Sequence, residues 1–506
     1  MKKLITALIT VVLMGCSSTP QPEKYESTWE SLSKHEAAPE WFRDAKLGIY
    51  FHWGVYSVPA FGDEWYPRWM HFEGTNHYDH HLAQYGHPSE FGYHDFVPMF
   101  KAENFDASEW ADLFVQAGAR FAGPVAEHHD GFSMWDSDAT PWNAADMGPK
   151  RDITGQLAKA IRERGMKFIT TFHHAKHLQR YRETAQEEME SDMNQRQKFW
   201  LSHYPYIEGL PPVSEDLKLK YLYGNIPENQ WIEEVWFGKL KEVIDQYQPD
   251  IIWFDSWLDQ IPEAHRQKFS AYYLNEAQKW GKEVVIVRKQ DDLPLNYTVD
   301  DLEKSRKNRL EPDPWMTDET VSKGSWCYTE DLEIKESKDV LHVLIDIVSK
   351  NGVLLLNISP MADGTIPDIQ KKVLTDMGDW LGKYGEAIYE TRPWYIHGEG
   401  PTVEPEGHFR NNQAFLKLKY NWKDVRYTTK DQTIYATLLG WPDDEKEVLL
   451  RSFAPDSLTV PIKLRAVTML GSEDDLKWEP KDEGLLIRLP EIAPDQMAVV
   501  FKVITE

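Results

Sequence analysis

The chain has 506 residues, of which 41% are hydrophobic and 21 are tryptophan, so it can bury a large core and does not have the composition of a disordered protein. Lys and Arg number 56 against 82 Asp and Glu, which gives a formal net charge of −26. The sequence has no basic stripe, so we expect no nucleic-acid partner, and an acidic surface also disfavours general adhesion to anionic lipid.

The N-terminus has the pattern of a targeting segment. Two lysines precede the apolar run LITALITVVLM, and this run is too short to span a membrane as a mature helix. The LMGC ending resembles a lipobox, so we expect residues 1–15 to be a lipoprotein signal and Cys16 to be the lipidated first residue; an ordinary signal peptide is the alternative. We then expect residues 16–35 to form a tether, and the protein to be exported and lipid-anchored at the bacterial outer membrane or in the periplasm. After lipidation only Cys327 remains, so we expect no intrachain disulfide.

Strand-like apolar runs alternate with helix-like stretches through the first three quarters of the chain. This alternation predicts a parallel (β/α) TIM-like barrel. A loop at 55–95, a charged insertion of helical character at about 176–226 and an irregular stretch at 290–336 interrupt it. The predicted strands are 46–54, 120–128, 166–174, 250–256, 283–289 and the run VLLLNISP. The predicted helices are 106–118, 152–164, 229–247, 263–280, 337–350 and 367–386.

The pattern changes after about Trp394, where helical periodicity disappears. Short β-like runs separated by turn residues follow, namely TIYATLLGW, EVLLRSF, AVTMLG, GLLIRLP and MAVVFKVI. Short strands of this kind predict an antiparallel β-sandwich. The expected organisation is therefore a catalytic barrel at 36–393 and a C-terminal sandwich at 394–506.

Five of the predicted strands end in polar, reactive side chains. In a parallel barrel the carboxyl ends of the strands meet at one face, which is where active sites are built. These strand ends carry His52, His128 with His129, His173 with His174, Asp255, and Arg288.

Asp255 follows the apolar residues IIWF and lies two residues before Trp257. A buried carboxylate beside tryptophan suits attack on the anomeric carbon of a sugar, and the alternative is that Asp255 caps a helix.

The histidines allow two interpretations. Adjacent His128 and His129 point to opposite sides of a regular strand, so both face the site only if the chain bends at Asp130–Gly131. Imidazoles then hydrogen-bond sugar hydroxyls. The alternative is that these side chains surround a divalent ion, the candidate ligands being His52, His128, His173 and His174. No HxH or HExxH spacing supports such a metal site.

No phosphate-binding or dinucleotide-binding glycine motif is present in the sequence, so we expect neither cofactor nor metal. Many tryptophans fall in the loops at the predicted mouth of the barrel, and together with the histidines and carboxylates they favour a carbohydrate substrate.

At this point the chain resembles a known family, the α-L-fucosidases of glycoside hydrolase family 29. The resemblance implies a (β/α) barrel with a C-terminal β-sandwich. It also implies a retaining, exo-acting enzyme that releases terminal L-fucose from fucosylated oligosaccharides or polysaccharides. The matching segments are KLGIYFHWGVYSVPAFGDEWY (46–66), FKAENFDASEWADLFVQAGAR (100–120), EHHDGFSMWDS (127–137), PDIIWFDS (249–256), WMTDETVSKGSWCY (315–328) and YGEAIYETRPW (384–394).

The same resemblance implies roles for individual residues. Asp255 is similar to the nucleophile, which forms a covalent fucosyl-enzyme, and Trp253 matches an active-site tryptophan. Phe172 or His173 falls where relatives have Tyr or His, and Arg288 where an Arg near the ring is often found. The residues expected to bind the sugar, by hydrogen bonds or by ring stacking, are His52, Glu64, Trp65, His128, His129, His173, Trp253, Arg288 and Trp326.

The acid/base follows the strand after the nucleophile and has no strong motif. Glu303 in VDDLEKSR resembles the glutamate of a DFERG-like segment and is our choice, with Glu311 and then Glu319 as alternatives. Lys304–Ser305 and Cys327 depart from the family pattern, which affects the expected loop shape. The rival hypotheses are a metal-dependent hydrolase and a surface glycan-binding protein without catalysis. The glycosidic linkage, the choice between sulfated fucan and host-type glycan, and the oligomeric state stay open.

Overall fold

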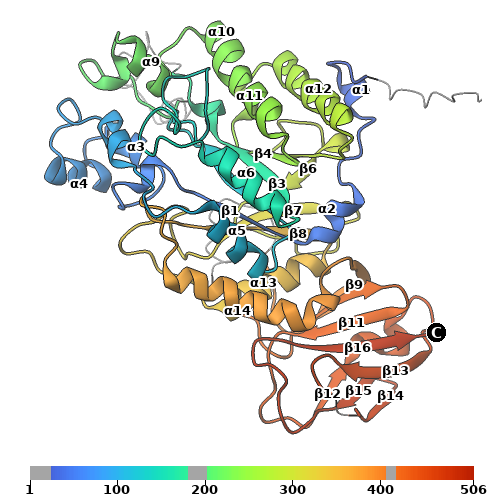
Figure 1. Cartoon of the computed structure of the whole chain (residues 1–506). Coiled ribbons are helices and arrows are strands. Elements are labelled where there is room, and N and C mark those ends of the chain that lie inside the picture. The colour runs from blue at the N-terminus through green and yellow to red at the C-terminus, as the bar shows by residue number, and fades with distance from the viewer. Residues whose placement is uncertain (1–23, 180–201, 406–416, 474) are drawn as a thin grey trace, which may run out of the picture.

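The computed structural model describes residues 24–179, 202–405, 417–473 and 475–506. It contains a closed barrel of eight parallel strands followed by two antiparallel sheets, which confirms the predicted fold class (Figure 1). The predicted export signal, Cys16 and the charged part of the insertion at 180–201 lie outside the described residues. The barrel strands are β1 Leu47–Phe51, β2 Phe121–Glu127, β3 Lys167–Phe172, β4 Ile251–Phe254, β5 Val285–Lys289, β6 Val299–Asp301, β7 Trp315–Thr320 and β8 Gly352–Ile358.

Helices surround the barrel, and aspartates cap several of them. Asp106 Oδ1 accepts hydrogen bonds from the first turn of α5, and Asp152 accepts one from Gly155 N at 2.8 Å in α6. Among the described residues no helix is long and apolar enough to cross a membrane. The helices are α1 Trp29–Leu32, α2 Glu40–Ala45, α3 Tyr66–Trp69, α4 Asn76–Gln84, α5 Ala107–Gln116, α6 Ile153–Glu163, α9 Leu217–Tyr223, α10 Glu228–Gln230, α11 Phe237–Tyr247, α12 Glu263–Trp280, α13 Ser337–Ser349 and α14 Asp368–Tyr384.

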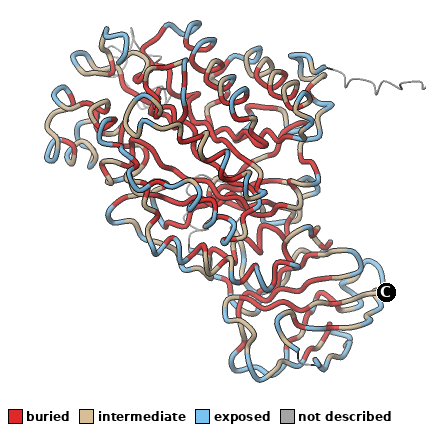
Figure 2. The backbone as a smooth tube through the Cα atoms, in the orientation of Figure 1, coloured by how far each residue is buried: buried red, intermediate tan, exposed pale blue. Residues whose placement is uncertain are grey.

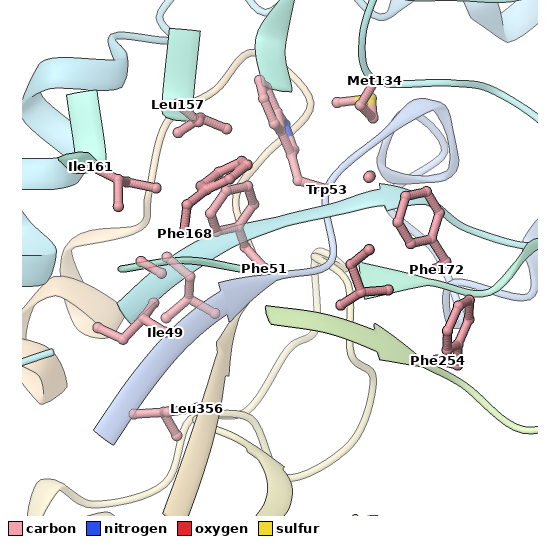
Figure 3. Close-up of a cluster of buried hydrophobic side chains, with 14 of the residues drawn as sticks. Ile49, Phe51, Trp53, Met134, Leu157, Ile161, Phe168, Phe172, Phe254 and Leu356 are labelled. Atoms are coloured by element: carbon pink, nitrogen blue, oxygen red, sulfur yellow. The ribbon is translucent and has the colours of Figure 1, made fainter. Parts of the chain in front are cut away.

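The outer face of the barrel packs against these helices. Figure 3 shows outward side chains of β1 and β3 meeting Leu157 and Ile161 of α6, and Figure 2 shows that the barrel strands are buried along their length. Each fully buried Phe, Leu or Ile side chain contributes about 1.5–3 kcal/mol relative to exposure, so this layer is a main source of stability.

The alternate residues of the same strands fill the inside of the barrel. They form a separate buried cluster with Phe42 and Ala45 of α2, the helix that precedes β1 at the amino ends of the strands. Gly48 makes room for this packing, because a Cβ at that position would lie 2.1 Å from the Phe121 ring. The interior is therefore solid below the carboxyl ends of the strands.

Two barrel strands occur where the sequence predicts irregular structure. β6 and β7 both lie within 290–336, and they lack the apolar runs of the other strands because acidic residues occupy inward positions. β6 pairs with β5 through Val299 opposite Val287 and Asp301 opposite Lys289. A sequence reading based on hydrophobic runs misses strands of this kind.

The C-terminal region is built from two sheets that share one core. β9 begins at Arg392 and contains the predicted domain boundary at 393–394. Side chains of both sheets, among them Tyr427 and Leu485, pack together, as expected for a sandwich. One sheet holds β13 Leu464–Met469, β16 Val499–Thr505, β11 Thr433–Leu438, β10 Val425–Lys430 and β9 Arg392–Glu399; the other holds β12 Glu447–Leu450, β15 Gly484–Arg488 and β14 Trp478–Lys481.

A buried ionic network joins α13 of the barrel to this C-terminal region. Asp346 Oδ2 lies 2.8 Å from Lys350 Nζ, and its Oδ1 lies 2.5 Å from Arg426 Nε in β10. Glu404 Oε1 accepts from Arg426 Nη2 at 2.8 Å, and Arg306 Nη1 lies 3.7 Å from Asp346 Oδ2. We call these five residues the interdomain network.

Candidate active site

A cavity of about 390 Å³ opens at the carboxyl ends of the barrel strands. Its size lies in the lower part of the roughly 300–1,000 Å³ range of small-molecule sites. Its wall holds all but two of the residues chosen from the sequence as catalytic or sugar-binding, namely His52, Glu64, Trp65, His128, His129, His173, Asp255, Glu303 and Trp326.

The two-residue period of the strands explains this gathering. Ile251 and Trp253 belong to the cluster inside the barrel, so Asp255 continues the inward face of β4. Ile169 of β3 also belongs to this cluster, so His173, four residues later, continues the inward face of that strand. β2 shows a register irregularity between Val125 and Glu127, after which both His128 and His129 line the cavity, as the predicted bend requires. Gly131 at the bend has φ +81, a backbone conformation that glycine adopts without strain.

Arg288 does not line the cavity, contrary to the sequence prediction. It lies out of phase with Val285 and Val287, which point inward, and its guanidinium donates to Leu293 O. The next residue, Lys289, has the inward phase and lines the cavity. The prediction placed the cation of this strand one residue too early.

Asp255 is largely buried, with 14% of its side chain exposed, yet it holds its charge. Its Oδ1 lies 3.2 Å from Lys289 Nζ, and its Oδ2 lies 3.3 Å from His129 Nε2. Burial opposes ionisation, but the Lys289 ammonium and the hydrogen bond from His129 outweigh it and hold the pKa of Asp255 well below its usual range. The carboxylate is therefore anionic at neutral pH.

Glu303 is the second carboxylate that contacts the same lysine, with Oε2 at 3.2 Å from Lys289 Nζ. The oxygens of Asp255 and Glu303 that bind the shared nitrogen are therefore separated by no more than twice this distance. That limit accommodates the roughly 5–5.5 Å carboxyl separation of retaining glycosidases.

The two alternative glutamates lie elsewhere. Glu311 precedes β7, its backbone N–H faces Lys350 O at the amino end of β8, and its side chain pairs with Arg309 at 3.0 Å. It lies therefore at the end of the barrel opposite the cavity. Glu319 is bound by Lys335 at 2.7 Å and faces a different pocket.

Lys289 contacts a third carboxylate, Asp318 of β7, at 3.3 Å. Asp318 also accepts a hydrogen bond from Tyr50 OH at 3.0 Å. Asp301 lies beneath this group, and its burial and the neighbouring Asp318 raise its pKa well above the usual value. Trp253, the second predicted residue that does not line the cavity, lies under the ammonium, whose nitrogen is 4.7 Å from the ring centre.

His52 is held in one tautomer by Asn357 of β8. The Asn357 amide nitrogen donates to Trp326 O at 2.8 Å, so its oxygen faces His52 and accepts from both the backbone N–H and Nδ1, at 2.9 and 2.8 Å. Nδ1 therefore carries the ring hydrogen and Nε2 carries a lone pair. Burial lowers the pKa of His52 to about 3, so the ring is neutral at physiological pH.

Two further imidazoles, those of His128 and His173, lie beside His52. The ring centres of His128 and His173 lie 4.5 Å apart, and burial lowers the pKa of both, although Asp255 opposes the shift at His173. One nitrogen each of His52, His128 and His173 lies within 4.8 Å of the other two, a geometry that could hold a metal ion. His174 does not join them, because its Nε2 faces Trp236 O behind the barrel wall.

The outer wall of the cavity is formed by two tryptophans and a carboxylate. The Trp65 ring lies 5.0 Å from that of His129, and the Trp326 ring lies 5.3 Å from that of His52. Glu64 Oε2 accepts a hydrogen bond from Trp326 N at 3.1 Å, so it ties the two loops together. Burial, and then Asp63, raise the pKa of Glu64 to about 7.

Several site residues were not predicted from the sequence. Lys289, Asp318 and Asn357 all lie in phase with inward apolar residues of their own strands, so the two-residue alternation would have found them. His203 packs its ring 5.3 Å from that of His129 and follows the insertion, where no periodic pattern points to it.

Comparisons with known proteins agree with this geometry. A family model described as alpha-L-fucosidase matches residues 12–386, and one for the alpha-L-fucosidase C-terminal domain matches 420–504. The chain is 32% identical to rat tissue alpha-L-fucosidase over 94% of this chain and 91% of that protein, and 29% identical to the human tissue enzyme over 98% and 95%. A crystal structure of Thermotoga maritima alpha-fucosidase in complex with fucose superposes with a TM-score of 0.73 at 27% identity, covering 95% of this chain and 100% of that one.

Proposed function

The chain belongs to the alpha-L-fucosidase family and is a fucose-releasing glycosidase, and we propose that it acts by double displacement with Asp255 as nucleophile and Glu303 as acid/base. The observation that carries this proposal is the contact of both carboxylates with one ammonium nitrogen, each at 3.2 Å. Because the cavity ends on the solid interior of the barrel, it suits a single terminal sugar, which supports exo action.

In the first step, the ionised Asp255 attacks the anomeric carbon of fucose. The bond from that carbon to the glycosidic oxygen breaks, while Glu303 gives its proton to the departing oxygen. The products are the leaving alcohol and a fucosyl ester on Asp255. Anionic Asp255 meets the requirement for an activated nucleophile.

In the second step, Glu303 removes a proton from water and the water oxygen attacks the anomeric carbon. The ester bond to Asp255 breaks, which releases fucose and returns both carboxyl groups to their starting states. Two inversions at one carbon give net retention of configuration.

The remaining side chains of the wall suit the sugar. Neutral His52 offers a lone pair to a hydroxyl hydrogen, and Glu64 offers carboxylate oxygens. Trp65 and Trp326 offer apolar faces for the methyl group that distinguishes fucose from sugars with a 6-hydroxyl. Hydroxyls of the wrong configuration would leave buried polar groups unpaired, which is a strong basis for selectivity. We propose fucosylated glycans as substrates on these grounds.

Replacement of Glu303 by Gln tests the assignment of the acid/base. We expect kcat/KM for a fucoside with a poor leaving group to fall by about 10²–10⁴-fold, while an activated aryl fucoside retains its first step. Azide should restore turnover of the aryl fucoside and yield a fucosyl azide. Matched variants Glu311→Gln and Glu319→Gln should need no rescue; azide rescue of either one, with none at Glu303, would overturn the choice.

A metal-dependent hydrolase is the second candidate, because three histidine nitrogens lie close enough to hold an ion. Neutral imidazoles are common zinc ligands. The contact of both Asp255 and Glu303 with the Lys289 ammonium favours the double displacement.

We also propose that the protein is exported and lipid-anchored through Cys16, on the strength of the charged start, the apolar run and the LMGC ending. Labelling with a radioactive fatty acid should mark the wild-type protein but not Cys16→Ser. Equal labelling of both would contradict this proposal.

A further inference from the structure

The Lys289 ammonium has more acidic neighbours than one cation normally has. Its side chain is 6% exposed, and Asp255, Glu303 and Asp318 each place an oxygen within 3.3 Å of Nζ. Burial disfavours the charged form, but these carboxylates outweigh it and raise the pKa of Lys289 well above its usual value. The lysine is therefore protonated at neutral pH.

The other basic groups near the cavity are bound differently. Lys304 also lines the cavity, but its ammonium donates to Gly324 O at 2.8 Å and lies 4.3 Å from the Trp326 ring centre. His129 contacts Asp255, and burial lowers its pKa, so it donates a hydrogen without carrying a positive charge at neutral pH. Lys289 is thus the cation whose contacts join Asp255 to Glu303.

The reaction moves one negative charge between these same two carboxylates. Before the first step Asp255 is ionised and Glu303 holds the proton. After it, Asp255 is a neutral ester and Glu303 is ionised. The second step reverses both changes. In each state one of the two groups is an anion, and each has an oxygen 3.2 Å from Lys289 Nζ.

We propose that Lys289 is the shared counterion of the double displacement, stabilising the charge on Asp255 before the first step and on Glu303 after it without changing its own position. This inference rests on the proposed function. A fixed charge that faces both ends of the transfer needs no reorganisation as the charge moves, and preorganisation of this kind is a major source of catalysis. Lys289 is accordingly a catalytic residue that faces the reacting groups.

The groups that face the two partners set the expected pH behaviour. Asp255 faces Lys289, His129 and His173, while Lys289 faces Asp255, Glu303, Asp318 and Asp301. Removing the positive charge leaves neutral imidazoles as the main support of the Asp255 carboxylate. An opposite charge within about 4–6 Å typically lowers a carboxyl pKa by 1–3 units, so its loss should move the acidic limb of the pH–rate profile upward.

The test measures pH profiles of kcat/KM for wild type, Lys289→Met and Lys289→Arg with an activated aryl fucoside. In Lys289→Met we expect the acidic limb to move up by about 1–2 pH units, and kcat/KM at neutral pH to fall by about 10²–10⁴-fold. The step that hydrolyses the fucosyl-enzyme should slow as well, because Glu303 loses the same partner. Lys289→Arg, which keeps the charge, should return the limb toward its wild-type position.

Lys239 supplies the matched control for a merely structural lysine. It is fully buried and paired with Glu127 at 2.7 Å, but on the helix side of β2 and away from the cavity. Lys239→Met should lower the melting temperature and leave the acidic limb unmoved. If Lys289→Met does not accumulate as folded protein, Lys289→Gln, which keeps N–H donors without the charge, replaces it.

An acidic limb that stays at its wild-type pH in Lys289→Met or Lys289→Gln would overturn the inference. This failure differs from failure of the proposed function. Near-normal turnover by Asp255→Ala would rule out the double displacement itself. If Asp255→Ala is inactive and the acidic limb of the pH–rate profile is unmoved in Lys289→Met, only the proposed role of the lysine is ruled out.

Discussion

Two buried ionic networks in this molecule use the same side-chain types in opposite proportions. At the cavity one cation, Lys289, contacts three carboxylates. In the interdomain network three cations surround Asp346 and Glu404. An excess of carboxylates leaves a group that can hold a proton and give it away, which catalysis requires. An excess of cations keeps Asp346 ionised, which suits a permanent connection between α13 and β10.

We expect the largest effect when the carboxylate that reacts is removed. Asp255→Asn should lower kcat/KM by about 10⁴-fold or more, because the neutral amide cannot form the ester. The melting temperature should change little, since the variant also relieves crowding of negative charge around Lys289. Steady-state kinetics with an aryl fucoside and a thermal melt measure both. Substantial activity in Asp255→Asn would contradict the view that the network at the cavity serves catalysis.

The equivalent change in the interdomain network should act on stability instead. Asp346→Asn removes the charge that binds Lys350 and Arg426, and breaking a buried pair costs about 3–5 kcal/mol. Urea unfolding followed by circular dichroism measures the loss, while KM for the fucoside should stay at its wild-type value. Asp339→Asn on the same helix breaks only the partly exposed pair with Lys419 and should cost about 0–1 kcal/mol. A loss of similar size in both variants would be evidence against a special role for the network.

The pH dependence of that loss is the next, smaller effect. Burial opposes the charge on Asp346, but Lys350, Arg426 and Arg306 outweigh it and hold its pKa below the usual value. A carboxyl group with a depressed folded-state pKa stabilises the protein above its unfolded pKa of about 3.9 and loses that contribution as the pH falls. The difference between wild type and Asp346→Asn should therefore shrink by about 1.4 kcal/mol for each pH unit below about 4. Urea titrations at pH 7, 4 and 3 would show this, and a difference that widens toward acid would contradict it.

The smallest expected effect is that of a chelator. If Lys289 supplies the positive charge of the site, EDTA should leave kcat/KM unchanged within error. Dialysed enzyme assayed with and without EDTA, and then with added zinc, provides the measurement. Activity that disappears with EDTA and returns with zinc would favour the histidine-bound metal over the double displacement.

The sequence predicts the barrel and most of its active site because apolar strands and their terminal polar residues are both visible in it. Asp255 is an example, since it directly follows IIWF at the end of β4. A search for apolar runs does not find β6 and β7, because Asp301 and Asp318 interrupt the apolar inward faces of these two strands. The charged residues of the site therefore make the strands that carry them hard to predict from the sequence.

The choice between Arg288 and Lys289 has a different origin. Both are cations at the end of β5, and only the inward phase of Val285 and Val287 distinguishes them. The resemblance to a family favoured the arginine, whereas the strand period favours the lysine. His203 could not be found by either route, because its position depends on how the chain returns from the insertion.

Asn357 has a consequence for the design of ligands. Because its amide oxygen accepts the hydrogen on His52 Nδ1, Nε2 carries a lone pair and can only receive a hydrogen. A ligand atom that meets this nitrogen must bring a hydrogen of its own. A fluorine in place of a hydroxyl has no hydrogen to donate, and its lone pairs would repel the lone pair on His52 Nε2. The affinities of a series of fluorinated sugars would therefore reveal which ring carbon carries the hydroxyl that His52 recognises.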